Sequence, residues 1–293
     1  MTAPAVPPGV TVIGAGNWGI SLVHAVLAAR IPLREIVVRR IPRAKPRGLE
    51  AIPFVLASGA ELTAAVLWIC VPDSRIAVTA EELAALRPGL RGQIVVHSSG
   101  ALSVDQLRAA AKAGAGVGSI HPVMSFPTRD PVPLEGVLFG VEAEPAVRRK
   151  LFKLVRKLGG KPFAIPSKNK ALYHAATTLA SPLLVSALST ALAAARKAGL
   201  STREAKSLIE PLAQATVRNF FERGAEKSFS GPFARGDAPT IDLHLRALAR
   251  HPILAGVYRA LARQAVSSLP VREPENLSRV IEAAGETSNS RRR

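Results

Sequence analysis

The sequence predicts an α/β protein with two domains: a doubly wound parallel sheet at the N-terminus, then an all-helical C-terminal domain. Three observations lead to this prediction. A glycine-rich turn stands between a β-branched run and an apolar helix near residues 10–27. Apolar runs and helical stretches then alternate, as they do where crossover helices join parallel strands. The strand pattern stops near Pro166, so we expect the domains to span 1–166 and 167–293.

The glycine turn is the feature from which the rest of the chain can be placed. Gly14, Gly16 and Gly19 spell G-x-G-x-x-G between a strand and a helix, the fingerprint of Rossmann-type dinucleotide sites. The first glycine permits the turn, the second lets a diphosphate approach, and the third lets the helix pack closely. We therefore expect these glycines, with Asn17 and Trp18 between them, to bind a cofactor. The alternative is a glycine turn without a ligand.

Two arginines indicate which dinucleotide binds. Arg39 and Arg40 follow the second expected strand, at the position where NAD-binding folds carry an acid for the ribose 2′-hydroxyl. A guanidinium binds a 2′-phosphate bidentately, whereas a carboxylate repels it. We therefore expect NADP in preference to NAD. The alternative is that these arginines belong to a solvated loop.

The next elements follow the α/β alternation. Strands are expected at 34–38, 66–71, 93–96, 116–120, 137–141 and 162–165, and helices at 79–86, 104–113 and 146–158. The residues at three of the strand ends are Val71, Pro72, His97, Ser98 and His121. Ligands bind at the carboxyl ends of strands in such sheets, so we expect the first four to contact the cofactor and His121 the substrate. Turn formation by Ser-Ser-Gly and a rigid His-Pro corner are the alternatives.

The second half is predicted to be helical throughout. Residues 167–198 are expected to form one long helix, kinked or interrupted at Pro182. Further helices are expected at 202–221, 240–250, 253–268 and 275–284, with an unstructured tail from about 286. The loop Gly231–Asp237 either closes over the site or caps the helix that follows it.

Composition limits the function classes. The chain has 39 Lys and Arg against 21 Asp and Glu, a net charge of +18, but the excess is spread over both halves and aromatic residues make up only 4%. A nucleic-acid site needs clustered charge with aromatics between. Cys70 is the one cysteine, so no disulfide framework forms, and no pair of residues has metal-ligand spacing. We expect a cytoplasmic protein with a small-molecule substrate, no metal, and neither nucleic acid nor membrane as partner.

Six motifs together resemble a known family. They are Gly14–Gly19, Val71–Ile76, Val96–Ala101, Ser119–Met124, Lys170–Ala175 and Gly231–Asp237. The chain is similar to Rossmann-like proteins that carry domain of unknown function 2520, within the 6-phosphogluconate-dehydrogenase-like superfamily that includes pyrroline-5-carboxylate and ketopantoate reductases. Proteins of this group are often described as oxidoreductases that use NADP or coenzyme F420, so NADP stays the first expectation. The resemblance also implies a homodimer.

The resemblance gives the interdomain helix a catalytic role. Lys170 and His174 share a helix face, and by resemblance they supply a proton while hydride passes between nicotinamide and a small carbonyl or imine compound at the domain interface. The alternative is a surface lysine with a structural histidine. Ser181 and Arg235 are expected near the substrate, although Pro182 stands where relatives carry Asn. A non-catalytic dinucleotide sensor or scaffold is the other function that fits the sequence.

Overall fold

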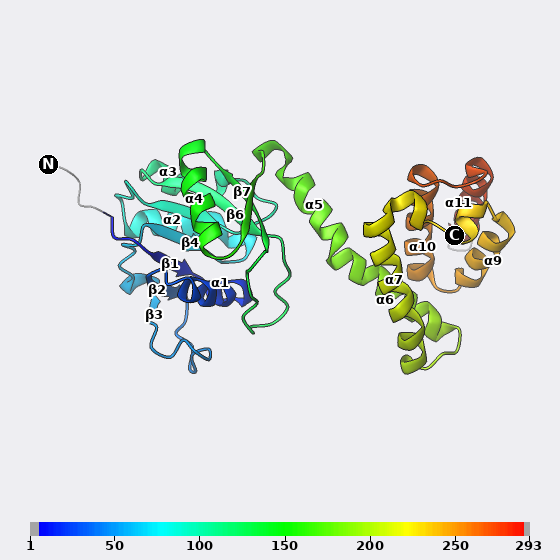
Figure 1. The fold of residues 1–293 in the computed structure, drawn as a ribbon, viewed down its shortest axis with the longest axis horizontal. Helices are drawn as coiled ribbons and strands as arrows, with labels where there is room; N and C mark the ends of the chain where they lie inside the picture. Colours follow the sequence, from blue (N-terminus) through cyan, green and yellow to red (C-terminus); the bar gives the residue numbers. More distant parts are fainter. Residues whose placement is uncertain (1–5, 290–293) are drawn as a thin grey trace. The chain divides into compact units, whose positions relative to one another are not determined.

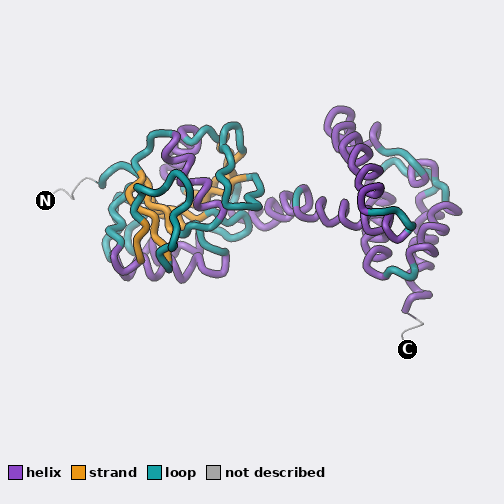
Figure 2. Tube along the Cα trace, turned by 90° about the horizontal axis from the view of Figure 1, so that it is seen from below, coloured by secondary structure: helices purple, strands orange, loops and turns teal. Residues whose placement is uncertain are grey.

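The computed structural model describes residues 6–289 and separates the chain into two compact units, Met1–Leu179 and Ala180–Arg293. Strands and the helices between them form the first unit, and helices alone form the second (Figures 1 and 2). The first unit includes most of helix α5 (Lys170–Ala180), which the sequence assigned to the second domain.

One eight-stranded sheet forms the centre of the first unit, and its order is β3-β2-β1-β4-β5-β6-β7-β8. Its strands are β1 (Val10–Ile13), β2 (Leu33–Val38), β3 (Phe54–Leu56), β4 (Val66–Ile69), β5 (Ile94–His97), β6 (Gly116–Pro122), β7 (Leu138–Ala143) and β8 (Lys161–Ala164). All neighbours pair in parallel except β6 and β7. The predicted doubly wound α/β fold is confirmed.

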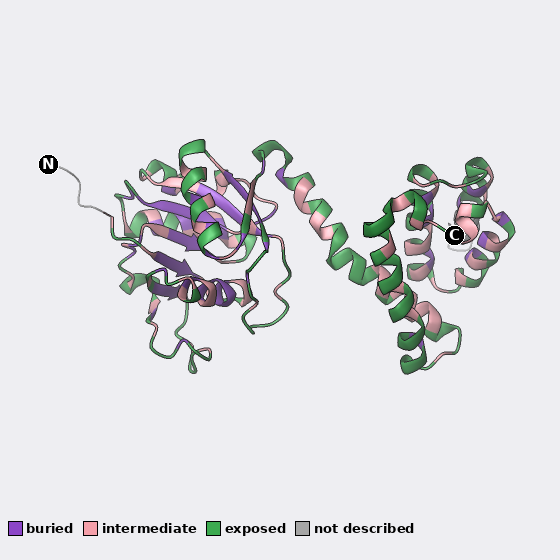
Figure 3. Cartoon of the chain, in the orientation of Figure 1, coloured by how far each residue is buried: buried purple, intermediate pink, exposed green. Residues whose placement is uncertain are grey.

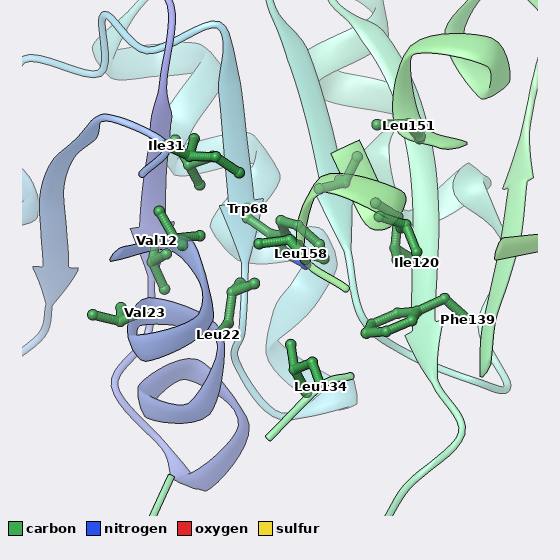
Figure 4. Packing of buried hydrophobic residues seen from close by; sticks show 14 of the residues in the cluster. Val12, Leu22, Val23, Ile31, Trp68, Ile120, Leu134, Phe139, Leu151 and Leu158 are labelled. Carbon is green, nitrogen blue, oxygen red and sulfur yellow. The ribbon is translucent and has the colours of Figure 1, made fainter. Parts of the chain in front are cut away.

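Helices cover both faces of the sheet. They are α1 (Asn17–Ala28), α2 (Ile76–Leu86), α3 (Arg108–Lys112) and α4 (Pro145–Lys157). Alternate side chains of a strand point to opposite faces: Trp68 packs with residues of α1 and α4, whereas Leu67 and Ile69 pack with residues of α2 and α3. Figure 4 shows the first of these clusters, in which Leu22 lies near Val12 and Trp68.

The antiparallel step between β6 and β7 has a simple cause. Residues 123–137 join these strands without a helix, whereas the crossover between parallel neighbours is usually an α-helix. Instead this segment, which we call the strap (residues 123–136), runs along α1. Asn17 Nδ2 donates to the Phe126 carbonyl at 2.9 Å, and the Val132 amide donates to Ser21 Oγ at 3.2 Å. Leu134 is buried near Leu22 (Figure 4).

Seven helical segments make up or lead into the second unit. After α5 come α6 (Pro182–Lys197), α7 (Thr202–Ser228), α8 (Pro232–Arg235), α9 (Ala238–Leu248), α10 (Pro252–Ser268) and α11 (Pro274–Asn289). The predicted interruption near Pro182 is confirmed, because Ser181 has non-helical angles (φ −123°, ψ −87°) and Pro182 opens α6. Gly224 breaks the regular geometry of α7 at φ 80°, close to the expected helix end at 221.

Two sequence predictions in the second unit need correction. Residues 232–235, expected to be non-helical, form the short helix α8, and Asp237 caps α9 by accepting from the Thr240 amide at 3.2 Å. The capping alternative for this loop is therefore confirmed. The tail expected to be unstructured from about 286 is helical as far as Asn289, and residues 290–293 lie outside the described residues.

The helices after the sheet leave much apolar surface uncovered. Within the described residues α6 buries none of its side chains, and α7 buries only Ala205. Figure 3 accordingly shows α7 largely green and α6 partly green and partly pink. Leu212 and Phe221 of α7 are 63% and 81% exposed. By length and composition alone, the stretch Ser167–Lys197 is long and apolar enough to cross a membrane.

Candidate functional site

The three glycines of the turn have different surroundings. A side chain at Gly14 would collide with the Cys70 carbonyl, and one at Gly19 would collide with the Gly14 carbonyl. Gly14 also has φ +109°, which side chains rarely adopt. A Cβ at Gly16, in contrast, meets nothing within 4 Å. Gly14 and Gly19 thus keep the turn closed, and Gly16 leaves an open surface where a ligand can approach the backbone.

The N-terminus of α1 has the features of an anion-binding site. Gly16 is its N-cap, no side chain bonds to the first turn, and that turn carries no acidic residue. The first N–H groups of a helix lack partners within it and form its positive end. A diphosphate at this position would accept hydrogen bonds from those groups.

A cavity of about 320 Å³ lies on one side of the glycine turn. Gly14 and Gly16 line it, together with three arginines from distant parts of the chain: Arg39, Arg75 and Arg129. Arg75 is paired with Glu82 of the same cavity at 3.3 Å. Arg39 therefore shares a cavity with the glycine turn, whereas Arg40 is not among the residues that line it.

A second cavity of about 320 Å³ lies on the other side of the turn. The two share four lining residues, namely Gly16, Cys70, Val71 and Pro72, so they form one crevice along the carboxyl edge of the sheet. Five further residues that the sequence predicted for the cofactor or the substrate line this second part: Asn17, Trp18, Gly19, Ser98 and His121. Asp73, Ser99, Met124 and Phe126 also line it.

Both tryptophans of the chain converge on one hydroxyl. The indole N–H groups of Trp18 and Trp68 donate to Ser98 Oγ at 2.7 and 2.8 Å. Trp18 lines the second cavity and packs against Phe126 of the strap, with ring centroids 4.9 Å apart. Burial raises the pKa of the neighbouring Cys70 thiol, so this cysteine stays protonated. The two indole N–H groups therefore fix the position of the Ser98 hydroxyl in the wall of the second cavity.

His97 occupies a different place from the expected one. Its side chain is fully buried, its Nδ1 accepts from the Ser99 amide at 3.1 Å, and its Nε2 lies 3.1 Å from the Ser103 carbonyl. These partners fix the neutral tautomer with hydrogen on Nε2. Burial, with the Lys170 charge, lowers the pKa of His97 to about 4. Both ring nitrogens are occupied by the turn after β5, which was the alternative interpretation.

That turn also positions a carboxylate. Ser99 Oγ donates to Asp73 Oδ2 at 2.8 Å and accepts from the Leu102 amide at 2.9 Å. Asp73 follows β4 and Ser99 follows β5, so the bond joins the ends of two adjacent strands. Asp73 adds an acid to the wall of the second cavity.

Three aromatic rings meet at the end of β6. His121 Nδ1 and Tyr173 Oη are 2.8 Å apart, and the His174 ring stands edge-on to His121 with centroids at 5.5 Å. Gly100 makes room for them, because a Cβ there would collide with His174 and lie 2.8 Å from His121 Nε2. Burial lowers the pKa of His121 to about 4 and raises that of Tyr173 to about 12. Both groups are therefore neutral near pH 7.

Lys170 lies beneath these rings and not at the surface. It is 2% exposed; its Nζ donates to Glu142 Oε2 at 2.9 Å and also to Ser119 Oγ. The other oxygen of Glu142 accepts from the Val104 amide at 3.2 Å. Burial lowers the pKa of Lys170 and the Glu142 carboxylate opposes that effect. The ion pair with Glu142 attaches the start of α5 to β7, and the bond to Ser119 attaches it to β6. Tyr173 and His174 follow about one helical turn later.

The remaining candidates belong to other parts of the chain. Ser181 precedes α6 and Arg235 lies in α8, both in the second unit, and their contact with substrate stays a prediction. Among the described residues, no group of three or more His, Cys, Asp or Glu side chains could hold a metal.

Two family models match the chain. Residues 8–122 match the Rossmann-like domain, and residues 137–265 match the domain of unknown function 2520. The chain is a Rossmann-like protein with a DUF2520 domain. The family resemblance seen in the sequence is thereby confirmed. The second match begins at β7, so the family domain includes the last part of the sheet as well as most of the helices.

Solved structures share the fold at low sequence identity. A protein from Thermotoga maritima is 24% identical, with 97% of this chain and 100% of that one covered and a TM-score of 0.66. A reductive aminase from Aspergillus terreus, in complex with NADPH and ethyl-5-oxohexanoate, is 16% identical over 92% and 97% of the two chains, with a TM-score of 0.65. An imine reductase from Myxococcus stipitatus with NADP⁺ is 20% identical over 89% and 95%, also with 0.65. Among curated proteins, no sequence matches significantly.

Proposed function

We propose that this protein is an NADP-dependent oxidoreductase that transfers hydride between nicotinamide and a small carbonyl or imine compound. The observation that carries the proposal is the continuous crevice, which runs from Arg39 past Gly16 to His121. It offers a guanidinium at one end, an open glycine and a helix N-terminus in the middle, and proton-bearing rings at the other end. The similar structures that contain NADPH or NADP⁺ with a reductive aminase or an imine reductase support this choice.

The residues present fit the cofactor. Gly16 and the first amides of α1 would hold the diphosphate, Arg39 the 2′-phosphate, and Trp18 with Ser98 the wall beside the nicotinamide. When bound, the reduced nicotinamide supplies a hydride to the carbon of a C=O or C=N group. The protein must then deliver one proton to the oxygen or nitrogen.

The His121–Tyr173 pair is the proposed source of that proton. With Tyr173 O–H donating to Nδ1, the neutral imidazole carries its hydrogen on Nε2, which can pass to the substrate. Nδ1 then takes the phenol proton, and the half-buried Tyr173 regains one from water. Lys170, which the resemblance suggested as donor, instead positions the helix that carries Tyr173 and His174. His174 borders the same site and stays a second proton donor in this proposal.

Ligand binding and turnover test the proposal separately. Both tryptophans lie in the first unit beside the crevice, so their fluorescence should change on addition of NADPH, and the unfolding temperature should rise. NADPH oxidation is then followed against a panel of keto acids and cyclic imines. Failure of both NADPH and NADH to bind would overturn the proposal. Tight binding without turnover of any panel member would support the sensor alternative.

We infer that a second copy of the chain covers the apolar faces of α6 and α7. Exposed leucine and phenylalanine side chains on α7 are costly in water, and the resemblance implies a homodimer. Leu212→Glu should then shift the mass measured by light scattering from dimer toward monomer. Gln214→Glu adds the same charge at an exposed polar position of the same helix and should leave the dimer intact. A monomeric wild-type chain would contradict the inference.

A further inference from the structure

The strap brings a positive charge to the glycine turn from a distant part of the chain. Its two bonds to α1, Asn17 to Phe126 and Ser21 to Val132, hold the strap on either side of residues 127–131. Trp18 packs on Phe126 and strengthens the first attachment. Both attachments are on the first two turns of α1, so the segment between them is held close to the N-terminal end of that helix.

Arg129 lies in this held segment and lines the first cavity together with Gly14 and Gly16. Its neighbours Thr128 and Asp130 bond to each other, through Thr128 Oγ1 and Asp130 Oδ2 at 3.1 Å. Within residues 6–289, no ion pair within 4.0 Å involves Arg129. The guanidinium is therefore available for an anion in the cavity.

Of the three arginines that line the first cavity, Arg39 has a proposed role at the 2′-phosphate and Arg75 has a partner. Arg39 follows β2, where the ribose 2′ position is recognised in this fold, and Arg75 is paired with Glu82. Arg129 belongs to the strap that is bonded to α1, and it lines the cavity with Gly16, where a Cβ would have open space and the first turn of the helix has no side-chain cap. The group of a dinucleotide that lies there is the diphosphate, which carries two negative charges that the amides neutralise only in part.

We propose that Arg129 binds the diphosphate of the dinucleotide, so that the strap between β6 and β7 is part of the cofactor site. The inference rests on the proposed function, since it requires a dinucleotide in the crevice. An arginine can offer two parallel N–H groups to phosphate oxygens. Because NAD and NADP share the diphosphate, Arg129 adds affinity for both and does not discriminate between them.

The test compares the affinities of NADPH and NADH, measured by titration of tryptophan fluorescence. Arg129→Gln should raise both dissociation constants by about 10-fold, the effect of losing one charge-assisted hydrogen bond. Arg129→Lys should restore part of the loss. Arg149→Gln is the matched control, because it removes the same charge from an exposed position on α4; it should leave both constants unchanged.

The outcomes separate the two proposals. Unchanged affinities in Arg129→Gln would overturn the inference and leave the proposed function intact. A loss confined to NADPH would also overturn it, because that result assigns Arg129 to the 2′-phosphate. An equal loss in Arg149→Gln would show a general charge effect and overturn it as well. If the wild-type chain binds neither nucleotide, the proposed function fails first and the inference fails with it.

Discussion

A hydrogen bond of 2.8 Å joins His121 Nδ1 to Tyr173 Oη, across 52 residues of sequence. It connects the end of β6, which lines the crevice, to the first turns of α5, which the buried Lys170–Glu142 pair holds in place. The proposed proton source and its support thus come from different elements that meet at one edge of the sheet. This arrangement leads to predictions that separate catalysis, positioning and folding.

Removing the phenol should slow turnover without weakening cofactor binding. Tyr173→Phe keeps the ring but loses the hydroxyl that bonds to His121, and a loss of about 100-fold in kcat is expected for a proton-transfer group. The NADPH dissociation constant should stay within a factor of about two. Tyr258→Phe is a close control, since its hydroxyl bonds to His244 at 2.9 Å in the second unit. An equal fall in kcat for both variants would argue against the His121–Tyr173 pair.

Breaking the buried ion pair should destabilise the first unit. Lys170→Met leaves the Glu142 carboxylate buried with one partner fewer, and such changes cost about 3–5 kcal/mol. Urea unfolding followed by tryptophan fluorescence reports on this unit. The double change Lys170→Met with Glu142→Leu should recover part of the loss. Arg75→Met breaks an exposed pair of the same unit and should cost less than about 1 kcal/mol; equal costs would contradict the prediction.

Two glycines two residues apart should respond differently to the same substitution. Gly16→Ala has open space, so the free energy of unfolding should change by less than about 1 kcal/mol while NADPH binding weakens. Gly14→Ala combines φ +109° with a collision against the Cys70 carbonyl, and we expect a loss of more than about 2 kcal/mol. Unfolding and binding measured on both variants check this. Unimpaired NADPH binding in Gly16→Ala would place the diphosphate elsewhere.

The two neighbouring arginines after β2 should differ in their effect on cofactor choice. Arg39 lines the first cavity, whereas Arg40 does not appear among its lining residues. Arg39→Asp replaces a phosphate-binding group by a repelling one and should move the preference from NADPH toward NADH by at least about 10-fold. Arg40→Asp makes the same charge change one residue on and should have a small effect. The ratio of the two dissociation constants is the measurement, and an unchanged ratio in Arg39→Asp would disprove the assignment.

Stability should fall as the solution becomes acidic, because His97 is buried in its neutral form. Its pKa is lowered from 6.5 to about 4 in the folded chain. The unfolded chain therefore binds the proton first, and stability present above pH 6.5 is lost as the pH falls toward 4, by up to about 3 kcal/mol. His121 acts in the same direction.

Urea midpoints at pH 7 and pH 4.5 check the pH effect. The difference between them should shrink in His97→Gln, whereas His251→Gln in the second unit should keep it. A midpoint of the wild-type protein that does not change with pH would contradict the neutral tautomer deduced from the Ser99 and Ser103 contacts.

The fold could be predicted because its signals are local. The G-x-G-x-x-G turn, the apolar runs and the break at Pro182 each depend on residues that are close in sequence. The short strand β3 was missed, since Phe54–Leu56 has too few residues to show a pattern. The antiparallel pairing of β7 depends on the path of the strap, which has no crossover helix, and periodicity does not reveal that path.

The site could be predicted only in outline. Strand ends identified Ser98 and His121, and Arg39 followed from its distance to the glycines. Burial of Lys170 could not be foreseen, because its partners Glu142 and Ser119 lie on two other strands. Arg129 gave no signal at all, since only the attachment of the strap to α1 brings it near Gly16.

The closeness of His121 and His174 to Gly100 makes that one position a marker for related sequences. Gly100 carries no functional atom, but a methyl group there would displace His174. A homologue with alanine at the equivalent position must therefore have moved or replaced the histidine, whatever the rest of its motifs suggest. Sorting family members by this single residue should divide them into those that keep the ring cluster and those in which His174 has moved or been replaced.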